Sequence, residues 1–395
     1  MKEFFMIAEK IYICGKGCIS NIGNGLSETR KGLFGNVPAP HLPSERTKST
    51  LKLPLFELDS FDGKEPNRTL ALLERALEDA LPFPAEILKK YRTGTAIGTT
   101  VANQLNDLDY YAALKEGKDV SDAPLKRYLS TDPSEYLRRK YGWTGPVSTI
   151  SNACASSADA AALAALWLKT GQCDIAVAGG ADELNKVPIA GFNALGVASD
   201  QPCKPFDANR KGLNLGEGAG IVILIGEKLK QQLFPGKRLP FLAGFGASGD
   251  AHHITSPHPD GAGLERAIRK AFSMAGITEK DIAFINAHGT GTPANDLCEA
   301  SVFARMFGGE VPFFSTKGKT GHTLGAAGIL ELIFTVISLE EQRIPASAGF
   351  SEKDPAMQFA PNREERGITG EYALSTSLAF GGCNTALIAG LERGS

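Results

Sequence analysis

The sequence predicts an α/β fold, because short apolar segments of strand type alternate with longer segments of helical period. Strands buried on both faces are rich in valine and isoleucine, as in DIAVAGG (174–180) and AGIVILIGE (219–227). Helical segments place apolar residues three and four positions apart, as in TLALLERALEDAL (69–81). The alternation predicts sheets that are covered by helices.

The remaining elements follow in the same alternating order. Further strands are expected at IYICGKG (11–17), TAIGTT (95–100), FLAGFGASGD (241–250), IAFINAHGT (282–290) and VPFFSTK (311–317). Further helices are expected at GLERAIRKAFSMAG (263–276), ANDLCEASVFARMFG (294–308) and LGAAGILELIFTVISLEEQ (324–342). The chain closes with two apolar runs, YALSTSLAF and CNTALIAGLE, which Gly381 and Gly382 join. Two such runs joined by Gly-Gly predict a β-hairpin.

Composition excludes several classes of protein. The 395 residues carry a net charge of −2, so no global basic field attracts nucleic acid or an anionic membrane. The longest apolar runs fall short of the ~20 residues that span a bilayer, and charges interrupt the N-terminal stretch too often for a secretory signal. The seven cysteines are scattered without a C-x-x-C pair, which indicates neither a zinc site nor a disulfide framework. We therefore expect a cytoplasmic protein.

One cysteine occupies a position suited to a nucleophile. Cys154 follows the strand-like VSTIS and precedes a helix built almost entirely of alanine and leucine (149–169). The N–H groups and dipole at a helix start stabilise a thiolate, so the position predicts a lowered pKa for Cys154. The alternative is a buried structural cysteine, which most lone cysteines are.

Two histidines and a lysine lie in glycine-rich turns after predicted strands. His288 opens HGTGTPAND, and Lys317 and His322 flank the turn in STKGKTGHTLGAAG. Each of them has an ordinary alternative as a loop or surface residue. In the helix that follows, Glu331, Thr335 and Ser338 form one narrow polar stripe, and the simplest interpretation of Glu331 is that it faces solvent.

A fourth stretch, LAFGGCN (378–384), places a Gly-Gly bend after Phe380. Backbone N–H groups at such a bend can form half of an oxyanion hole. Taken alone, the stretch is a hairpin turn.

Together, in this order, these motifs closely resemble the β-ketoacyl-[acyl-carrier-protein] synthases, and most of all the elongating Cys-His-His branch of the thiolase superfamily. The resemblance also covers GNG (23–25), KPFDANRKGLNLGEGAG (204–220) and SGDAHHITSPHPDG (248–261). It implies a thiolase-like fold of two similar α/β halves, stacked as a five-layer αβαβα sandwich. We place the halves at 1–235, with the cysteine, and 236–395, with the two histidines and the lysine.

The resemblance also implies roles for single residues. Cys154 corresponds to the nucleophile, His288 and His322 to the catalytic histidines, and Lys317 to the supporting lysine. Glu331 corresponds to a buried glutamate of the family, so the resemblance implies that it does not face solvent. The backbone N–H groups of Cys154 and Phe380 would form the oxyanion hole, with Phe380 also gating the acyl pocket. The implied reaction is decarboxylative condensation of an acyl group with malonyl-[acyl-carrier-protein], which needs no metal and no diffusible cofactor.

The substrates of that family travel on an acyl carrier protein. Thr255, Thr290 and Thr292 would bind the phosphopantetheine arm, and this assignment takes precedence over a metal site at His252, His253 and His258. Because carrier proteins are acidic, a basic patch is expected at the tunnel mouth. Our hypothesis for the patch is Lys64, Arg68, Lys126, Arg127 and Lys204.

The remaining expectations concern partners and alternatives. The family forms homodimers or heterodimers of related chains. Departures from its common pattern include RKGLN (210–214), Ala379 and Cys383, and they leave acyl-chain preference open. One alternative is a specialised ketosynthase for a polyene or polyketide chain. Others are a non-catalytic partner subunit that sets chain length, which usually lacks the nucleophile, and a cysteine-dependent hydrolase, which would leave the second histidine unexplained.

Overall fold

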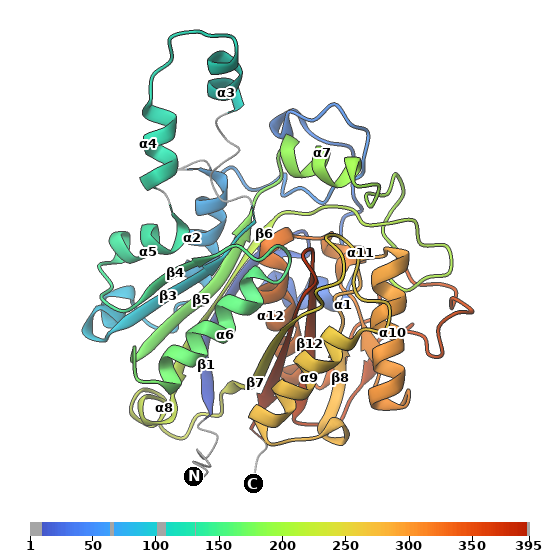
Figure 1. Cartoon of the computed structure of the whole chain (residues 1–395). Helices are drawn as coiled ribbons and strands as arrows, with labels where there is room; N and C mark the ends of the chain where they lie inside the picture. Colours follow the sequence, from blue (N-terminus) through green and yellow to red (C-terminus); the bar gives the residue numbers. More distant parts are fainter. Residues whose placement is uncertain (1–9, 64–66, 101–107, 131, 393–395) are drawn as a thin grey trace.

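The computed structural model describes residues 10–63, 67–100, 108–130 and 132–392 (Figure 1). Its strands are β1 (Ile11–Ser20), β2 (Gly23–Asn24), β3 (Thr93–Gly98), β4 (Val147–Ile150), β5 (Ile175–Asp182), β6 (Gly218–Gly226), β7 (Pro240–Gly249), β8 (Ile282–Asn286), β9 (Phe313–Phe314), β10 (Arg343–Ile344), β11 (Arg366–Gly367), β12 (Tyr372–Ala379) and β13 (Cys383–Leu391). The predicted hairpin is confirmed, since β12 and β13 pair antiparallel around the Gly-Gly bend.

The segments predicted to be helical at 69–81, 263–276, 294–308 and 324–342 and the segment after Cys154 are helices, and the structure adds helices that were not predicted. They are α1 (Leu26–Phe34), α2 (Arg68–Ala80), α3 (Leu108–Lys115), α4 (Ala123–Ser130), α5 (Pro133–Tyr141), α6 (Ser156–Lys169), α7 (Lys186–Ala194), α8 (Glu227–Leu233), α9 (Ala262–Ala275), α10 (Pro293–Phe307), α11 (Lys317–Thr320) and α12 (Ala327–Glu341). Short 3₁₀ turns occupy Glu45–Thr47, Ala85–Lys90, Glu279–Asp281 and Leu324–Ala326. The helix expected from 324 therefore begins three residues later, after the last of these turns.

The sheet contains the same topology twice. The strand path runs β4-β3-β5-β6-β1 and continues through β7-β13-β12-β8-β9. Reading each group from its outer edge gives β4-β3-β5-β6-β1 and β9-β8-β12-β13-β7, which is the same order with the same pattern of parallel and antiparallel neighbours. Among the described residues, the two groups share strand pairing only where Ile11 and Tyr12 pair with Leu242 and Phe241. The predicted pair of similar halves is thus present in the fold.

Helices form the remaining layers around the two strand groups. The central layer is α6, which packs on β3 and β5, against α12, which packs on β12 and β13. Outside, α2 packs on β1 and β6, and α9 packs on β7 and β13. This is the five-layer αβαβα sandwich. The topology changes from one half to the other between α8 and β7, around the division expected at 235 and 236, which stays a prediction.

Small residues let the central helices lie deep between the sheets. A side chain at Gly98 of β3 would place its Cβ 2.2 Å from the Ser157 nitrogen of α6. A side chain at Gly328 of α12 would place its Cβ 2.7 Å from the Ala158 Cβ. The alanine-rich sequence of α6 is therefore a packing requirement of the layer that carries Cys154 at its start.

Two further features concern the surface. The segment with α3 and α4 projects from the body of the molecule (Figure 1). Among the described residues, none of the helices has both the length and the apolar character needed to cross a membrane.

Candidate active site

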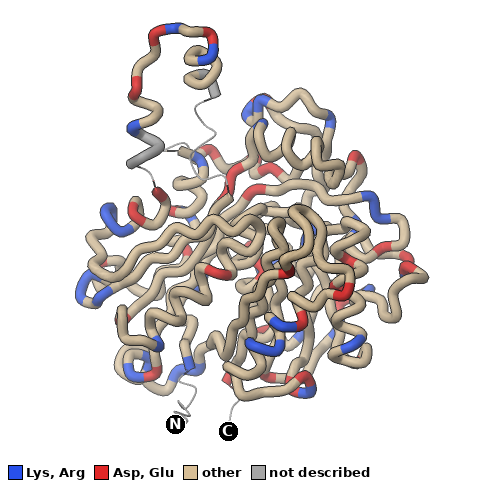
Figure 2. The backbone as a smooth tube through the Cα atoms, viewed as in Figure 1, with Lys and Arg blue, Asp and Glu red and all other residues tan. Residues whose placement is uncertain are grey.

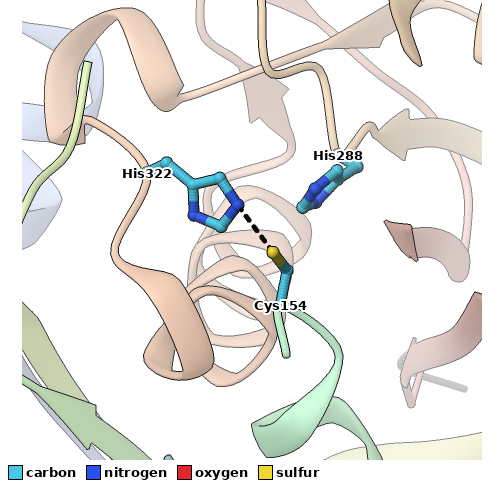
Figure 3. A group of neighbouring side chains, drawn as sticks. All are labelled: Cys154, His288 and His322. Atoms are coloured by element: carbon cyan, nitrogen blue, oxygen red, sulfur yellow. Dashed lines mark hydrogen bonds between the residues drawn. The ribbon is translucent and has the colours of Figure 1, made fainter. Parts of the chain in front are cut away.

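Cys154 sits in a sharp turn between β4 and α6. Ala153, the residue before it, has a φ of 46°, in the left-handed region that costs energy for any residue but glycine. The Ser156 hydroxyl donates to the Ala153 carbonyl over 2.6 Å and accepts the Asn152 N–H over 2.8 Å. These bonds hold the turn so that the sulfur of Cys154 projects into the site (Figure 3).

The predicted lowering of the Cys154 pKa is wrong. Burial raises the pKa of this thiol to about 12, because a buried site disfavours the charged thiolate. The Lys317 ammonium and the N–H groups of Phe380 and Cys154 oppose that effect without overcoming it. In addition, α6 begins at Ser156, so Cys154 lies before the helix rather than in its first turn.

His322 is the nearest ring to the sulfur. Its Nε2 lies 3.0 Å from Cys154 Sγ (Figure 3). The backbone N–H of Leu324 donates to its Nδ1 over 3.1 Å, and since a neutral imidazole carries one proton, that proton is on Nε2. The backbone of His322 is fixed as well, because its N–H donates to the Asn214 carbonyl over 2.8 Å. His322 therefore presents an N–H donor at the sulfur.

His288 is held by Lys317, which in turn pairs with Glu331. The Lys317 ammonium lies 3.2 Å from His288 Nδ1 and also donates to the His288 carbonyl and to the Glu331 carboxylate. Because an ammonium has no acceptor, Nδ1 of His288 accepts and the ring proton is on Nε2. Both histidines thus offer Nε2–H.

Both imidazoles are neutral at physiological pH. Burial lowers the pKa of His288 and of His322 well below the ordinary value, and the Lys317 charge lowers both further. The two ring centroids are 5.2 Å apart with an interplanar angle of 85°, so the rings present different edges around the same space. Two fixed, uncharged N–H donors next to a thiol can stabilise a negative oxygen.

The solvent-facing interpretation of Glu331 is wrong. Glu331, Thr335 and Ser338 are all buried, because α12 lies between the two strand groups and has no solvent side along this stripe. Burial raises the pKa of Glu331 to about 7, and Lys317 counteracts part of that shift. The carboxylate serves as the partner of the Lys317 ammonium.

A second buried carboxylate, Glu299 of α10, was not found by sequence reasoning. Its oxygens accept the N–H groups of His288 over 2.9 Å and of Gly289 over 2.7 Å, and the Thr376 hydroxyl over 2.8 Å. It therefore fixes the backbone at His288. Burial raises its pKa to about 7. The available signal was an acidic residue eleven positions after His288, between the apolar residues Cys298 and Ala300 of a predicted helix.

A cavity of about 310 Å³ leads to these groups. Its lining includes Cys154, both histidines, Phe192 and Phe380. The ring of Phe380 stacks on Phe192 at 5.6 Å, and Phe192 contacts the His322 ring edge-on at 6.2 Å. The backbone N–H groups of Phe380 and Cys154 both interact with the Cys154 sulfur. These two N–H groups are a pair of donors beside the sulfur, where an oxyanion would form.

The three threonines line the same cavity. Thr255, Thr290 and Thr292 come from two different loops, and the hydroxyls of Thr290 and Thr292 lie 2.9 Å apart. Thr255 belongs to the loop that contains His252, His253 and His258, where His252 and His253 are exposed and His258 is partly buried. Within the described residues, these three histidines do not form a cluster of potential metal ligands.

A different group has the spacing of a metal site. Ligand atoms of Cys154, His288 and His322 lie within 4.8 Å of one another. The Lys317 ammonium contacts His288 and opposes a cation there by charge repulsion. The expectation that the site works without a metal stays a prediction.

The structure places only part of the hypothetical basic patch, so the patch as a surface stays a prediction. Arg68 is wrong as a member, because its guanidinium binds Glu217 and the Phe61 and Leu58 carbonyls, and its side chain is only 10% exposed. Lys126 is exposed on the projecting α4 and pairs with Asp122, whereas Lys204 is partly buried. Lys64 and the side chain of Arg127 lie outside the described residues. Figure 2 shows both signs of charge interspersed over the chain.

Comparison with known proteins gives one family along the chain. The family model of the β-ketoacyl synthase N-terminal domain matches residues 67–229, and that of the C-terminal domain matches residues 240–351. A curated relative from Vibrio cholerae, named 3-oxoacyl-[acyl-carrier-protein] synthase 2, is 32% identical over 97% of this chain and 99% of its own length. A mitochondrial 3-oxoacyl-[acyl-carrier-protein] synthase from Arabidopsis thaliana is 33% identical over 80% of this chain and 72% of its own length.

Solved structures agree with the sequence relatives. A ketosynthase from Xenorhabdus doucetiae, solved in complex with its chain length factor, is 30% identical with a TM-score of 0.86, covering 97% of this chain and 98% of that one. A β-ketoacyl synthase from Burkholderia phymatum is 28% identical with a TM-score of 0.87, covering 98% of this chain and 100% of that one.

Proposed function

Because this chain belongs to the β-ketoacyl synthase family, we propose that it is an acyltransferase that condenses a carrier-bound acyl group with malonyl-[acyl-carrier-protein]. The observation that carries the proposal is the arrangement of two neutral histidines with Nε2–H groups beside the Cys154 thiol. That arrangement suits a reaction with an acyl-cysteine stage and an enolate stage.

In the first stage, Cys154 sulfur attacks the thioester carbonyl of the acyl group on the phosphopantetheine arm. The N–H groups of Cys154 and Phe380 stabilise the negative oxygen that forms. The carbon–sulfur bond to the arm then breaks, and the arm leaves as a thiol with the proton that Cys154 gives up. Because the free thiol is neutral, this proton transfer belongs to the acyl transfer itself.

In the second stage, the malonyl thioester loses carbon dioxide and leaves an enolate. Nε2–H groups of His288 and His322 donate to its oxygen, where the negative charge develops. The Lys317 ammonium holds His288 in the donor tautomer and keeps it neutral. The enolate carbon attacks the carbonyl of the Cys154 thioester, the carbon–sulfur bond to Cys154 breaks, and a β-ketoacyl product two carbons longer forms. The sulfur leaves as a thiolate and takes up a proton from solvent, which restores the neutral thiol.

The threonines support the arm, and the partners follow from its carrier. We assign Thr255, Thr290 and Thr292 to the pantetheine, because they line the cavity that leads to Cys154.

The partners are an acyl carrier protein and a second copy of this chain or a related chain. The seven cysteines are free thiols, in keeping with a cytoplasmic location. The reaction needs no metal and no diffusible cofactor.

A second candidate is a specialised ketosynthase of polyketide type. It is favoured by structural neighbours described as ketosynthase and chain length factor complexes, including the ishigamide pair, 27% identical with a TM-score of 0.88. The chemistry at Cys154 would be the same, and the acyl chain would differ.

Reconstituted turnover tests the proposal. Wild type and Cys154→Ala are incubated with a panel of acyl-carrier thioesters and malonyl-carrier, and protein and product masses are measured. We expect an acyl adduct on Cys154 in wild type only, with a product two carbons longer whose preferred mass identifies the chain. Acylation that persists in Cys154→Ala, or no adduct and no product from any thioester, would contradict the proposal.

A further inference from the structure

We propose that Lys319 is a positioning residue, which holds α11 against the end of α1 and so keeps Lys317 against His288. The inference rests on the proposed function, since it concerns the lysine that supports the second stage. It assigns a role to the second lysine of the KGKTG turn, which touches none of the reacting groups.

Lys319 makes three hydrogen bonds to the C-terminal end of α1. Its ammonium donates to the carbonyls of Gly32 over 3.2 Å, Leu33 over 2.9 Å and Gly35 over 2.7 Å. These carbonyls belong to the last turn and C-cap of α1, where a helix leaves its carbonyl groups without internal partners. A cation there also meets the negative end of the helix dipole. The contact joins the N-terminal half to the turn that carries Lys317.

The two lysines of α11 extend in different directions. Successive helical residues are about 100° apart, so Lys317 and Lys319 are separated by roughly 200° around the axis. Lys317 extends to His288 and Glu331, and Lys319 extends to α1. The short helix is thereby fixed between the catalytic cluster and α1.

Such a short helix needs external support. With four residues, Lys317–Thr320, it is far below the length at which a helix is stable by itself. The Asn21 amide donates to the Lys319 carbonyl over 2.8 Å, and Gly318 lies against the Ala348 carbonyl. Lys319 supplies the only side-chain ammonium among the described residues that binds the α1 end.

Comparing the two stages of the reaction distinguishes a positioning role of Lys319 from a general effect on stability, because unfolding reduces both stages equally. Acylation uses Cys154 with the Phe380 and Cys154 N–H groups, whereas decarboxylation uses the histidines and therefore Lys317. A displaced Lys317 would weaken the second stage most, because the first stage would lose only the Lys317 charge that partly offsets burial at the Cys154 thiol. It would also stop depressing the pKa of His288, which would then take up a proton at higher pH.

The experiment uses the full chain as Lys319→Met, Lys319→Gln and Lys319→Arg. Lys353→Met is the matched control, because Lys353 also donates to backbone carbonyls, those of Met357 and Gln358, away from the histidines. For each variant we would measure the rate of Cys154 acylation by intact mass, carbon dioxide release from malonyl-carrier across pH, and the melting temperature.

In Lys319→Met we expect decarboxylation to fall by about tenfold to a hundredfold, as for a misplaced catalytic group, while acylation falls by much less. The acid limb of the decarboxylation profile should move to higher pH. Lys319→Arg should recover most of the decarboxylation rate. Lys319→Gln should have an intermediate rate, and it replaces Lys319→Met in the comparison if that variant is unfolded.

Equal loss of both stages, loss that merely follows the folded fraction, or no loss at all would overturn the inference. So would the same split in Lys353→Met. Failure of the proposed function is distinguishable, because wild type itself would then form no acyl adduct and release no carbon dioxide.

Discussion

His322 Nε2 lies 3.0 Å from Cys154 Sγ, and the other ring nitrogen accepts the Leu324 N–H. The proton is therefore on the nitrogen that faces the sulfur. Because burial and Lys317 hold the pKa of His322 well below its ordinary value, the resting pair is a neutral imidazole donating toward a neutral thiol. This differs from the lowered thiol pKa that the position of Cys154 before a helix predicts.

The first prediction concerns the reactivity of Cys154 toward a small alkylating agent. With the thiol pKa raised to about 12 by burial, about one molecule in ten thousand is thiolate at pH 8. Alkylation by iodoacetamide, followed by peptide mass with Cys154→Ala as the control, should accelerate about tenfold per pH unit up to pH 10. A plateau near pH 7 would show that the site acidifies the thiol.

The second prediction concerns packing beneath the nucleophile. Gly98→Ala places a Cβ 2.2 Å from the Ser157 nitrogen, and because the neighbour is helix backbone, the strain should cost about 1–3 kcal/mol. Gly191→Ala is the control, since its Cβ meets nothing within 4 Å and alanine favours a helix. Chemical denaturation should show a large loss for the first variant and none for the second. Equal stabilities would remove the packing argument.

The third prediction is a pH dependence of stability. Burial raises the pKa of Glu183 to about 7, so the folded state holds a proton that the unfolded state releases near pH 4.5. The free energy of unfolding therefore decreases as pH rises from about 4.5 to 7. Glu183→Gln should match wild type at pH 4 and exceed it by about 1–3 kcal/mol at pH 8.

Urea unfolding at both pH values measures that difference. Glu57→Gln is the comparison, because the Glu57 carboxylate is buried but paired with Arg46, and its loss should destabilise the protein at neutral pH. If Glu183→Gln were also less stable than wild type at pH 8, a charged and compensated Glu183 would be indicated instead.

Sequence patterns specified the parts of this fold that depend on local order. The period of apolar residues located α2, α9 and α10 to within a residue or two, and the Gly-Gly bend located the final hairpin. The start of α12 was missed because Leu324 has a φ of 54° and the Gly325 N–H donates to Asp182 in the other half. No local pattern contains a contact of that kind.

Among the site residues too, those that local motifs identify were found, and those that depend on contacts between remote segments were not. The motifs brought Cys154, His288, Lys317 and His322 together correctly, and the cavity gathers the three threonines. The Cys154 pKa could not be predicted, because it depends on burial by distant segments. Arg68 was misassigned because its partner, Glu217, is remote in sequence, and Glu299 was missed because an acidic residue on a helix usually faces water.

The central claim is that two neutral histidines stabilise the enolate, and its most direct test is carbon dioxide release from malonyl-carrier without an acyl acceptor. It would be measured in wild type, His288→Ala and His322→Ala, with Cys154 acylation followed in parallel. Loss of one oxyanion donor typically costs about 10²–10³ in rate, so we predict that decrease for each variant while acylation continues. Decarboxylation at the wild-type rate in either variant would contradict the account.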